Sequence, residues 1–480
     1  MAECSVVEST SVPEASTEQT GQTKQAEHAH QTHQTHQTEQ TEPVAGGAAP
    51  RHRLAWLDAL RGIAALAVVF DHVSQYLLTG LRGHVYHWID AGEYGVFVFF
   101  LISGYIVPAS LERKGSIRTF WVSRLFRLYP LYLLAIGLAI ALWAIGRGSL
   151  HGAGGDPETS VLSQFLMMSN VLAGPNLPNV VWSLSYEMVF YLLLTALFIG
   201  GVHKRSGWYA LAFGAAAVVL GGLLPQQYFS HHLSSPRLIA AVADLILIAC
   251  LGVAVLLRGT PRLLGAGLAG VIAVLLVAFN GGWIFPWEGL AILGLMFTGT
   301  ALYRAEQGEY PWSRAIAVAV TTIGLSIAAG LWHSHAWHMS AGAETLWERK
   351  WFFAFFFAGL TFGGGLLLRH MRVPRWLAWL GLISYSMYLL HPLLVEMYYH
   401  SSWHRQHQSF DTQVLLFAVI LVILVAVSSV TYLLVERPMQ TLGRRLGKRL
   451  DTQFGPDRAP ARAVGHAGVR DTSVAGRAQA

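Results

Sequence analysis

Long apolar runs alternate along this chain with short polar segments. Twelve runs can be marked between residues 56 and 435, and most have the roughly 20 residues that a helix needs to cross the hydrocarbon of a bilayer. The pattern predicts an all-α fold, a polytopic transmembrane helical bundle of about 10–12 spans, because two of the runs are short. The runs lie near 56–78, 91–110, 126–145, 180–201, 207–225, 238–257, 263–279, 289–303, 314–332, 351–368, 376–399 and 412–435.

Polar segments flank this apolar region at both ends. Residues 1–50 are rich in Glu, Gln, Thr, Ser and His and hold too few apolar side chains to form a core, so we predict a disordered cytoplasmic tail there. The polar residues 441–480 are predicted to be a flexible cytoplasmic C-terminal tail. The integral membrane domain is then expected over residues 51–440.

Lys and Arg are distributed unevenly over the loops between the apolar runs. One alternate set of loops holds fourteen of them and the other set holds six. The positive-inside rule therefore predicts that both termini are cytoplasmic, N-in and C-in. The net charge of +6 is explained by these topology signals. We accordingly expect membrane lipid as a partner and no nucleic acid.

Two groups of histidines raise the question of a metal site. The tail contains the three-residue repeat HQTHQTHQTEQTE, and His333, His335 and His338 follow the ninth run. We interpret the repeat as low-complexity sequence and the second group as part of an aromatic-rich membrane interface. No metal is therefore predicted.

The first run, LDALRGIAALAVVFDH, carries four ionisable residues. Arg61 and His72 are eleven residues apart, which places them on one helix face about 16 Å apart along the axis. Asp58 lies one turn before Arg61 and can pair with it, whereas Asp71 points about 100° away from His72. Intramembrane charges normally face a bundle interior or a wet cavity, so His72 and Arg61 are candidate catalytic residues. The alternatives are a snorkelling Arg61 and a structural His72.

The fourth run begins with VVWSLSYEMVFYLL and contains Glu187. From the predicted span ends, Glu187 lies about 10 Å below the outer boundary and His72 about 14 Å below it. A carboxylate beside an imidazole orients the ring and stabilises its protonated form. We therefore predict that Glu187 and His72 share one cavity, with Trp182 of the same motif contacting the substrate.

Cations gather where the third run begins, in the sequence FWVSRLFRLYPLY and just before it. Arg124 and Arg127 lie one turn apart and follow Arg113, Lys114 and Arg118. Arginine side chains bind phosphate oxygens with two parallel hydrogen bonds, so this cluster fits a polyphosphate such as that of coenzyme A. A positive-inside topology signal explains the cluster almost as well.

Two other runs carry polar residues at their centres. Ser384, Tyr388 and His391 have the four- and three-residue spacing of one helix face, and Pro392 predicts a kink immediately after them. Ser103 stands beside a glycine in GVFVFFLISGYIV. We expect these residues to contact substrate, although hydrogen bonds and close packing between helices account for them equally well.

Six motifs in order make the chain resemble the acyltransferase family 3 membrane proteins over about residues 54–440. They are LDALRGIAALAVVFDH, GVFVFFLISGYIV, SRLFRLYP, VVWSLSYEMVFYLL, ISYSMYLLHPLL and VERP, and the fourth is most similar to the branch that decorates exopolysaccharides and other surface glycans.

The resemblance implies a multi-pass protein of the bacterial inner membrane that moves an acyl group, usually acetyl, from cytoplasmic acyl-coenzyme A to a sugar hydroxyl. The acceptor would be a lipid-linked or extracytoplasmic glycan, such as exopolysaccharide or lipopolysaccharide, and no cofactor would be bound. Arg61, His72 and Glu187 match the family's essential Arg, His and membrane-embedded Glu, and Arg124 and Arg127 match its Arg motif.

Two other functions fit the same sequence. A proton-coupled secondary transporter also has about twelve spans and intramembrane His, Arg and Glu. We find no internal repeat of the two halves, and the polar residues concentrate in the first four runs and the eleventh, which favours an enzyme. Acylation of a macrolide or a lipid is the third possibility.

Overall fold

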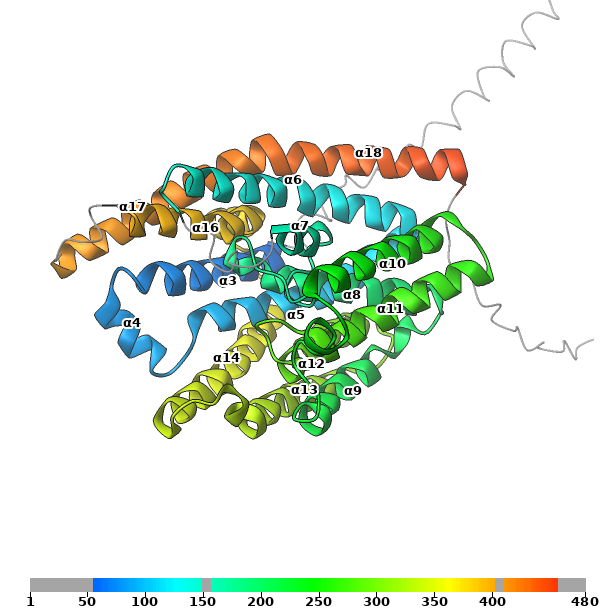
Figure 1. Cartoon of the computed structure of the whole chain (residues 1–480), viewed down its shortest axis with the longest axis horizontal. Helices are drawn as coiled ribbons and strands as arrows, with labels where there is room; N and C mark the ends of the chain where they lie inside the picture. The colour runs from blue at the N-terminus through cyan, green and yellow to red at the C-terminus, as the bar shows by residue number, and fades with distance from the viewer. Residues whose placement is uncertain (1–54, 149–156, 402–408, 456–480) are drawn as a thin grey trace, which may run out of the picture. The chain divides into compact units, whose positions relative to one another are not determined.

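The structure is a computed structural model that describes residues 55–148, 157–401 and 409–455. The predicted tail at 1–50, and the last part of the predicted tail at 441–480, lie outside the described residues. The described part contains α-helices, 3-10 turns and π-turns and no strand, which confirms the all-α prediction. Figure 1 shows these helices packed as one bundle.

The helices follow the apolar runs closely: each run contains one helix, except the run 376–399, which contains α15 and α16. In chain order they are α3 (Ala55–Ser74), α4 (Thr79–Tyr86), α5 (Ala91–Lys114), α6 (Ile117–Ala144), α7 (Pro157–Phe165), α8 (Trp182–Ile199), α9 (Ser206–Leu220), α10 (Pro236–Leu256), α11 (Thr260–Asn280), α12 (Pro286–Glu306), α13 (Trp312–His333), α14 (Ala341–Leu367), α15 (Arg375–Leu382), α16 (Ser384–Tyr399), α17 (Phe410–Thr431) and α18 (Arg437–Phe454). The short turns η1 (Asn179–Val181), η2 (His203–Arg205), η3 (Phe229–Leu233), η4 (Ser334–Trp337) and η6 (Tyr432–Glu436) join or extend them.

Eight helices of the described part are long and apolar enough to cross a membrane, and the bent pair α15–α16 makes up to nine. The chain is thus a polytopic helical membrane protein, with fewer such helices than the 10–12 predicted spans. The difference has physical causes: α3 carries three charged residues, α9 has only 15 residues, and α12 is less apolar than its neighbours. All three nevertheless pack against spanning helices. The N-in, C-in orientation stays a prediction.

The candidate site is framed by α3, α5, α6, α8 and α16. Helix α3 packs against α5, α15 and α16, and α5 also packs against α12, whose side chains are almost all buried. Glycines allow the closest approaches. A Cβ at Gly104 of α5 would lie 1.8 Å from the Met296 carbonyl oxygen of α12, and a Cβ at Gly381 of α15 would lie 1.8 Å from the Asp58 carbonyl oxygen of α3. These contacts hold α5 against α12 and α15 against α3.

The bend in the eleventh run lies before the site residues and not after them. Helices α15 and α16 meet at 68° around Ile383, whereas Pro392 lies inside the continuous α16. The kink at Pro392 stays a prediction. The chain bends where Gly381 packs directly on the backbone of α3, and the Ser384 hydroxyl then donates a hydrogen bond to the Gly381 carbonyl, 2.9 Å.

Residues 441–454, predicted to be flexible, form most of α18. Figure 1 shows α18 running beside α6. Gly443 and Gly447 face Phe126 and Thr119 of α6, and the Ser116 hydroxyl donates to Asp451, 2.9 Å. The alternation of apolar and basic residues in this segment is that of an amphipathic helix, so α6 provides the surface that orders it.

Candidate active site

Helices α3, α6 and α16, and the segment made of η1 and α8, each contribute to two cavities. The arginine cavity is lined by Arg61 of α3, Ser183 of α8 and Tyr388 of α16, among others. The histidine cavity is lined by His72 of α3, Asn179 of η1 and Pro392 of α16, among others. The two cavities have no lining residue in common.

The arginine cavity gathers three guanidinium groups and one carboxylate. Arg61, Arg124, Arg127 and Glu187 all line it. The side chain of Arg61 donates to the Asp58 carboxylate, 3.2 Å, which confirms the predicted pair. Arg124 is 6% exposed. One buried arginine, two half-buried arginines and a single lining carboxylate give the cavity a positive field that suits a polyanion.

Aromatic rings hold one of these arginines in place. The guanidinium of Arg124 lies over the rings of Phe120 and Tyr191, 5.4 and 5.3 Å from their centroids. The Tyr191 hydroxyl in turn donates to the Glu187 carboxylate. Cation–π contacts of this kind are worth about 0.5–2 kcal/mol, more when they are shielded from water. The arginine is thus positioned before any ligand arrives.

Glu187 does not lie beside His72, and the predicted pair is wrong. Glu187 lines the arginine cavity, whereas His72 lines the histidine cavity. The reason is the length of α3, which ends at Ser74 and not near residue 78, so that His72 lies in its last turn. Asn179, which lines the histidine cavity, belongs to the turn η1, and Glu187 lies eight residues further along the chain, within α8. The sequence estimate of equal depth therefore fails.

The hydrogen bond of His72 fixes which ring nitrogen is available for chemistry. His72 Nδ1 lies 3.0 Å from the Val68 carbonyl oxygen. A carbonyl only accepts, so Nδ1 must carry the hydrogen and Nε2 of the neutral ring must hold a lone pair. Asp71 is engaged elsewhere, since its carboxylate accepts from Arg82, 3.3 Å. The imidazole is therefore set up as a base at Nε2.

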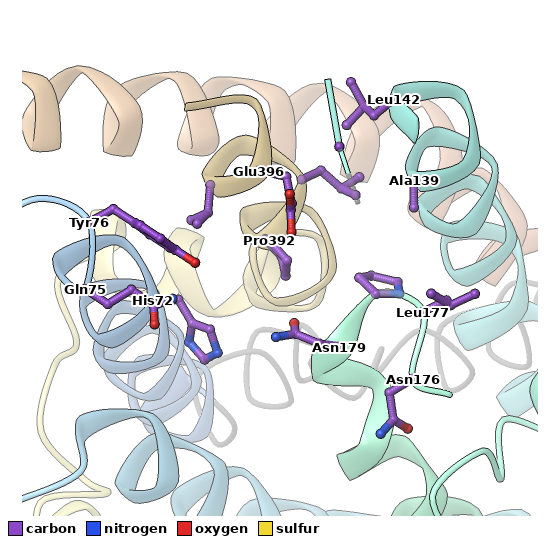
Figure 2. A pocket seen from close by; sticks show the side chains of 14 residues that line it. His72, Gln75, Tyr76, Ala139, Leu142, Asn176, Leu177, Asn179, Pro392 and Glu396 are labelled. Atoms are coloured by element: carbon purple, nitrogen blue, oxygen red, sulfur yellow. The ribbon is translucent and has the colours of Figure 1, made fainter. Parts of the chain in front are cut away.

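Figure 2 shows the surroundings of this base. The His72 ring projects from the end of α3 into the histidine cavity, and the Asn179 side chain points towards it. Polar side chains that the sequence analysis missed complete the lining, namely Gln75, Tyr76, Asn176, Asn179 and Glu396. The sequence could have pointed to two of these residues through their neighbours. Asn179 immediately precedes the VVWSLSYE motif, and Glu396 follows His391 by five residues.

Two of the three polar residues on this face of α16 line the arginine cavity, and the third, His391, lines neither cavity. Ser384 and Tyr388 line the arginine cavity. The Tyr388 hydroxyl lies 2.8 Å from the Ser183 hydroxyl and donates to the Val180 carbonyl, 2.9 Å. His391 is 1% exposed, and its ring contacts those of His72 and Tyr388, with centroids 4.9 and 6.1 Å away. Ring contacts thus run from Tyr388, which lines the arginine cavity, through His391 to His72, which lines the histidine cavity.

The two remaining predicted substrate contacts have different outcomes. Gly104 makes the expected close contact with α12, and its neighbour Ser103 lines the arginine cavity, where its contact with substrate stays a prediction. Trp182 lines neither cavity. Its ring packs instead against those of Tyr186 and Trp283, with centroids 6.2 and 6.3 Å away. Substrate contact by Trp182 stays a prediction.

Known proteins match most of this region. A family model described as an acyltransferase domain matches residues 54–234 and 244–433. The acyltransferase MdmB of Streptomyces mycarofaciens is 31% identical over 186 residues, which are 37% of this chain and 48% of that protein. The "Putative peptidoglycan O-acetyltransferase YrhL" of Bacillus subtilis (strain 168) is 27% identical over 179 residues, or 34% and 26% of the two chains.

Nodulation protein 10 of Rhizobium leguminosarum bv. viciae is 29% identical over 192 residues, or 36% of this chain and 51% of that protein. These matches span about half the length of the relatives or less. No solved structure gives a significant match.

Proposed function

The chain belongs to the acyltransferase domain family, and from that premise we propose that it is a membrane O-acyltransferase. It moves an acyl group, acetyl in the first instance, from cytoplasmic acyl-coenzyme A to a hydroxyl of a surface carbohydrate. One observation carries the proposal: a single helix, α3, presents a cation to one cavity and an imidazole base to another. That division matches a reaction whose donor and acceptor arrive from opposite sides of a membrane.

The arginine cavity is the proposed donor site. Coenzyme A carries phosphates, and guanidinium groups are the side chains best suited to bind them. Arg61, Arg124 and Arg127 supply three such groups from two helices. The offset of about 16 Å between Arg61 and His72 along α3 leaves room for the donor's extended arm between its phosphates and the reacting thioester. The arm passes Ser384 and Tyr388, which line the same cavity, and carries the thioester towards His72.

The histidine cavity is the proposed acceptor site. Its amide, carboxyl and phenol side chains offer both donors and acceptors of hydrogen bonds, which is what a sugar with several hydroxyls requires. A glycan acceptor is also supported by the name of the Bacillus subtilis relative, which refers to peptidoglycan. The side chains do not by themselves select one glycan over another.

His72 is the proposed catalyst. Its Nε2 lone pair takes the proton from the acceptor hydroxyl as a general base, a role that typically contributes 10²–10⁴-fold. The same atom is also the nucleophile required by a second route, in which the imidazole is acylated first and then passes the acyl group to the acceptor. Both routes use the Nδ1 hydrogen bond to Val68 to keep Nε2 facing the cavity.

The test uses the full chain reconstituted in lipid vesicles with labelled acetyl-coenzyme A outside and a glycan-bearing membrane extract as acceptor. The proposal predicts label in the glycan and release of free coenzyme A in equal amounts. Solute uptake without any dependence on coenzyme A would instead favour a secondary transporter. A protein that binds acetyl-coenzyme A but never releases coenzyme A, with any glycan fraction supplied, contradicts the proposal.

A further inference from the structure

A groove of about 850 Å³ runs between α13 and α14. Its two sides are formed by exposed residues of these helices, such as Val320 and Leu360, and its floor by buried residues of α5 and α12, such as Leu101 and Leu302. This lipid groove, as we call it below, shares no lining residue with the arginine cavity or the histidine cavity. Its size is within the range of about 300–1,000 Å³ that is usual for small-molecule sites.

Glycines keep the lipid groove open. A Cβ added at Gly324 of α13, or at Gly363 or Gly364 of α14, would meet no atom within 4 Å. Glycine is the least favourable residue in a helix after proline, so three glycines around one hollow maintain the space at a cost in helix stability.

The interior of the lipid groove offers no hydrogen bonds to an occupant. The hydroxyl of Thr298 on its floor donates to the Gly294 carbonyl of its own helix, 3.0 Å. Apart from Thr298 and Arg369, the lining residues are apolar or aromatic. A sugar or a phosphate inside would lose its hydrogen bonds to water without replacement, so the groove fits a hydrocarbon chain.

Positive charge gathers at one end of the lipid groove. The guanidinium of Arg369 lies just beyond the end of α14, 5.6 Å from the centroid of the Trp312 ring at the start of α13. Its Nε lies 3.7 Å from the Glu306 carboxylate and has no hydrogen-bond partner among the described residues. Arg372 and Arg375 follow and are exposed. Three arginines against one carboxylate leave this end positive, and the positive-inside rule places it at the cytoplasmic surface.

The depth of the lipid groove is that of one leaflet. It extends along α13 from Trp312 to Ile327, about 22 Å, and along α14 from Phe356 to Leu367, about 16 Å. Half a bilayer measures about 15 Å through the hydrocarbon and about 20–22 Å with the head-group region included. A lipid with its head group at Arg369 therefore reaches into the groove without crossing the midplane.

We propose that the lipid groove binds one anionic phospholipid of the cytoplasmic leaflet. One acyl chain lies between α13 and α14, and the phosphate lies against Arg369. A head group with a net negative charge is favoured by the positive end of the groove, whereas phosphocholine brings a cation of its own. This inference goes beyond the proposed function and does not depend on it.

The test measures lipid binding by the full chain in an uncharged detergent. Dioleoylphosphatidylglycerol or dioleoylphosphatidylcholine is titrated, and native mass spectrometry reports the lipids retained per chain and the affinity of the tightest one. Gly363→Leu fills the groove, and Arg369→Gln removes its cation. The matched controls are Gly267→Leu in α11, where a Cβ likewise meets no atom within 4 Å, and Arg445→Gln, which replaces an exposed arginine of α18.

We expect the wild type to retain one phosphatidylglycerol per chain about tenfold or more tightly than phosphatidylcholine, because the phosphate contacts a charged group. Arg369→Gln should reduce this preference to about twofold, and Gly363→Leu should weaken retention of the tightest phosphatidylglycerol about tenfold or more. Both controls should match the wild type. If Gly363→Leu fails to fold, Gly324→Leu on the other side of the groove decides.

Equal retention of the two lipids by the wild type overturns the proposal, as does retention within about twofold of wild type in a folded variant with a filled groove. Glycerol 3-phosphate, a head group without chains, should leave the Tm unchanged. A rise in Tm equal to that given by the lipid would overturn the proposal in favour of a soluble phosphate. None of these measurements involves acetyl-coenzyme A, so failure of the lipid site and failure of the proposed function are observed separately.

Discussion

Arg61 and His72 lie on the same helix, α3, yet they open onto different cavities. Their separation of eleven residues corresponds to about 16 Å along the axis. Arg61 faces a cavity with two other arginines, and His72 faces a cavity lined by amide and carboxyl groups. One rigid helix therefore sets the distance between the proposed phosphate site and the proposed base, without any contact between them.

Arg127 should matter for the donor and not for the chemical step. An Arg127→Gln substitution removes one cation from the arginine cavity, and hydrogen bonds to charged groups contribute about 1.5–3 kcal/mol. We expect the KM for acetyl-coenzyme A to rise roughly 10- to 100-fold, with a smaller change in kcat. Steady-state kinetics over a range of donor concentrations measure this. Lys448→Gln, on the exposed face of α18, is the control. An unchanged donor KM in Arg127→Gln would rule out this donor site.

Glu187 should act on donor affinity, because the structure places it among the arginines. Glu187→Gln makes the arginine cavity more positive, so the donor KM should fall severalfold while the pH dependence of kcat stays the same. Kinetics at several pH values between 5 and 9 provide the measurement. If the acidic limb of the kcat profile moved instead, Glu187 would be coupled to His72 as the sequence first suggested.

Close packing of α5 on α12 should make Gly104 intolerant of any side chain. Gly104→Ala would place a Cβ 1.8 Å from a backbone oxygen of Met296, so the helices must separate. We expect a loss of stability of about 1–3 kcal/mol or more, measured as a lower Tm in detergent. The control is Gly137→Ala in α6, where a Cβ meets nothing within 4 Å. There, stability should rise by up to about 1 kcal/mol, because alanine favours helix. Equal Tm values in the two variants would contradict the contact.

Stability in mild acid should depend on His203 in the turn between α8 and α9. Burial, helped by the positive charges of Arg304 and Lys204, lowers the pKa of His203 to about 4. Its pKa in the unfolded chain is about 6.5, so the unfolded state binds the proton better, and stability falls as the pH drops from about 6.5 to 4.

The corresponding experiment compares the wild type with His203→Gln. The loss attributable to His203 amounts to at most about 3 kcal/mol at pH 4. Tm values recorded across this pH range should converge or cross, since the variant lacks the titrating group. Parallel curves for the two proteins would show that His203 titrates normally in the fold.

Much of the helical order could be predicted from hydrophobicity alone. Each apolar run became a helix, because burial of apolar side chains and satisfaction of backbone hydrogen bonds leave a membrane segment little choice. The pair Asp58–Arg61 was likewise predictable, since a three-residue spacing brings side chains together on any helix.

Relations between helices were harder to predict. The depth of His72 depended on where α3 ends, and no apolar pattern marks Ser74 as that end. The bend before α16 depends on contact between Gly381 and α3, which is a tertiary contact and leaves no periodic signal. Trp182 stands within the same short motif as Glu187, yet its ring packs on Trp283 and it lines neither cavity.

The most direct test of the account is acetyl transfer by His72→Gln in lipid vesicles, measured beside the binding of acetyl-coenzyme A. Because His72 is remote from the arginine cavity, the account predicts wild-type donor affinity and a loss of transfer of about 100-fold or more. Transfer at the wild-type rate by this variant, with the donor still bound, would contradict the assignment of His72 as the base.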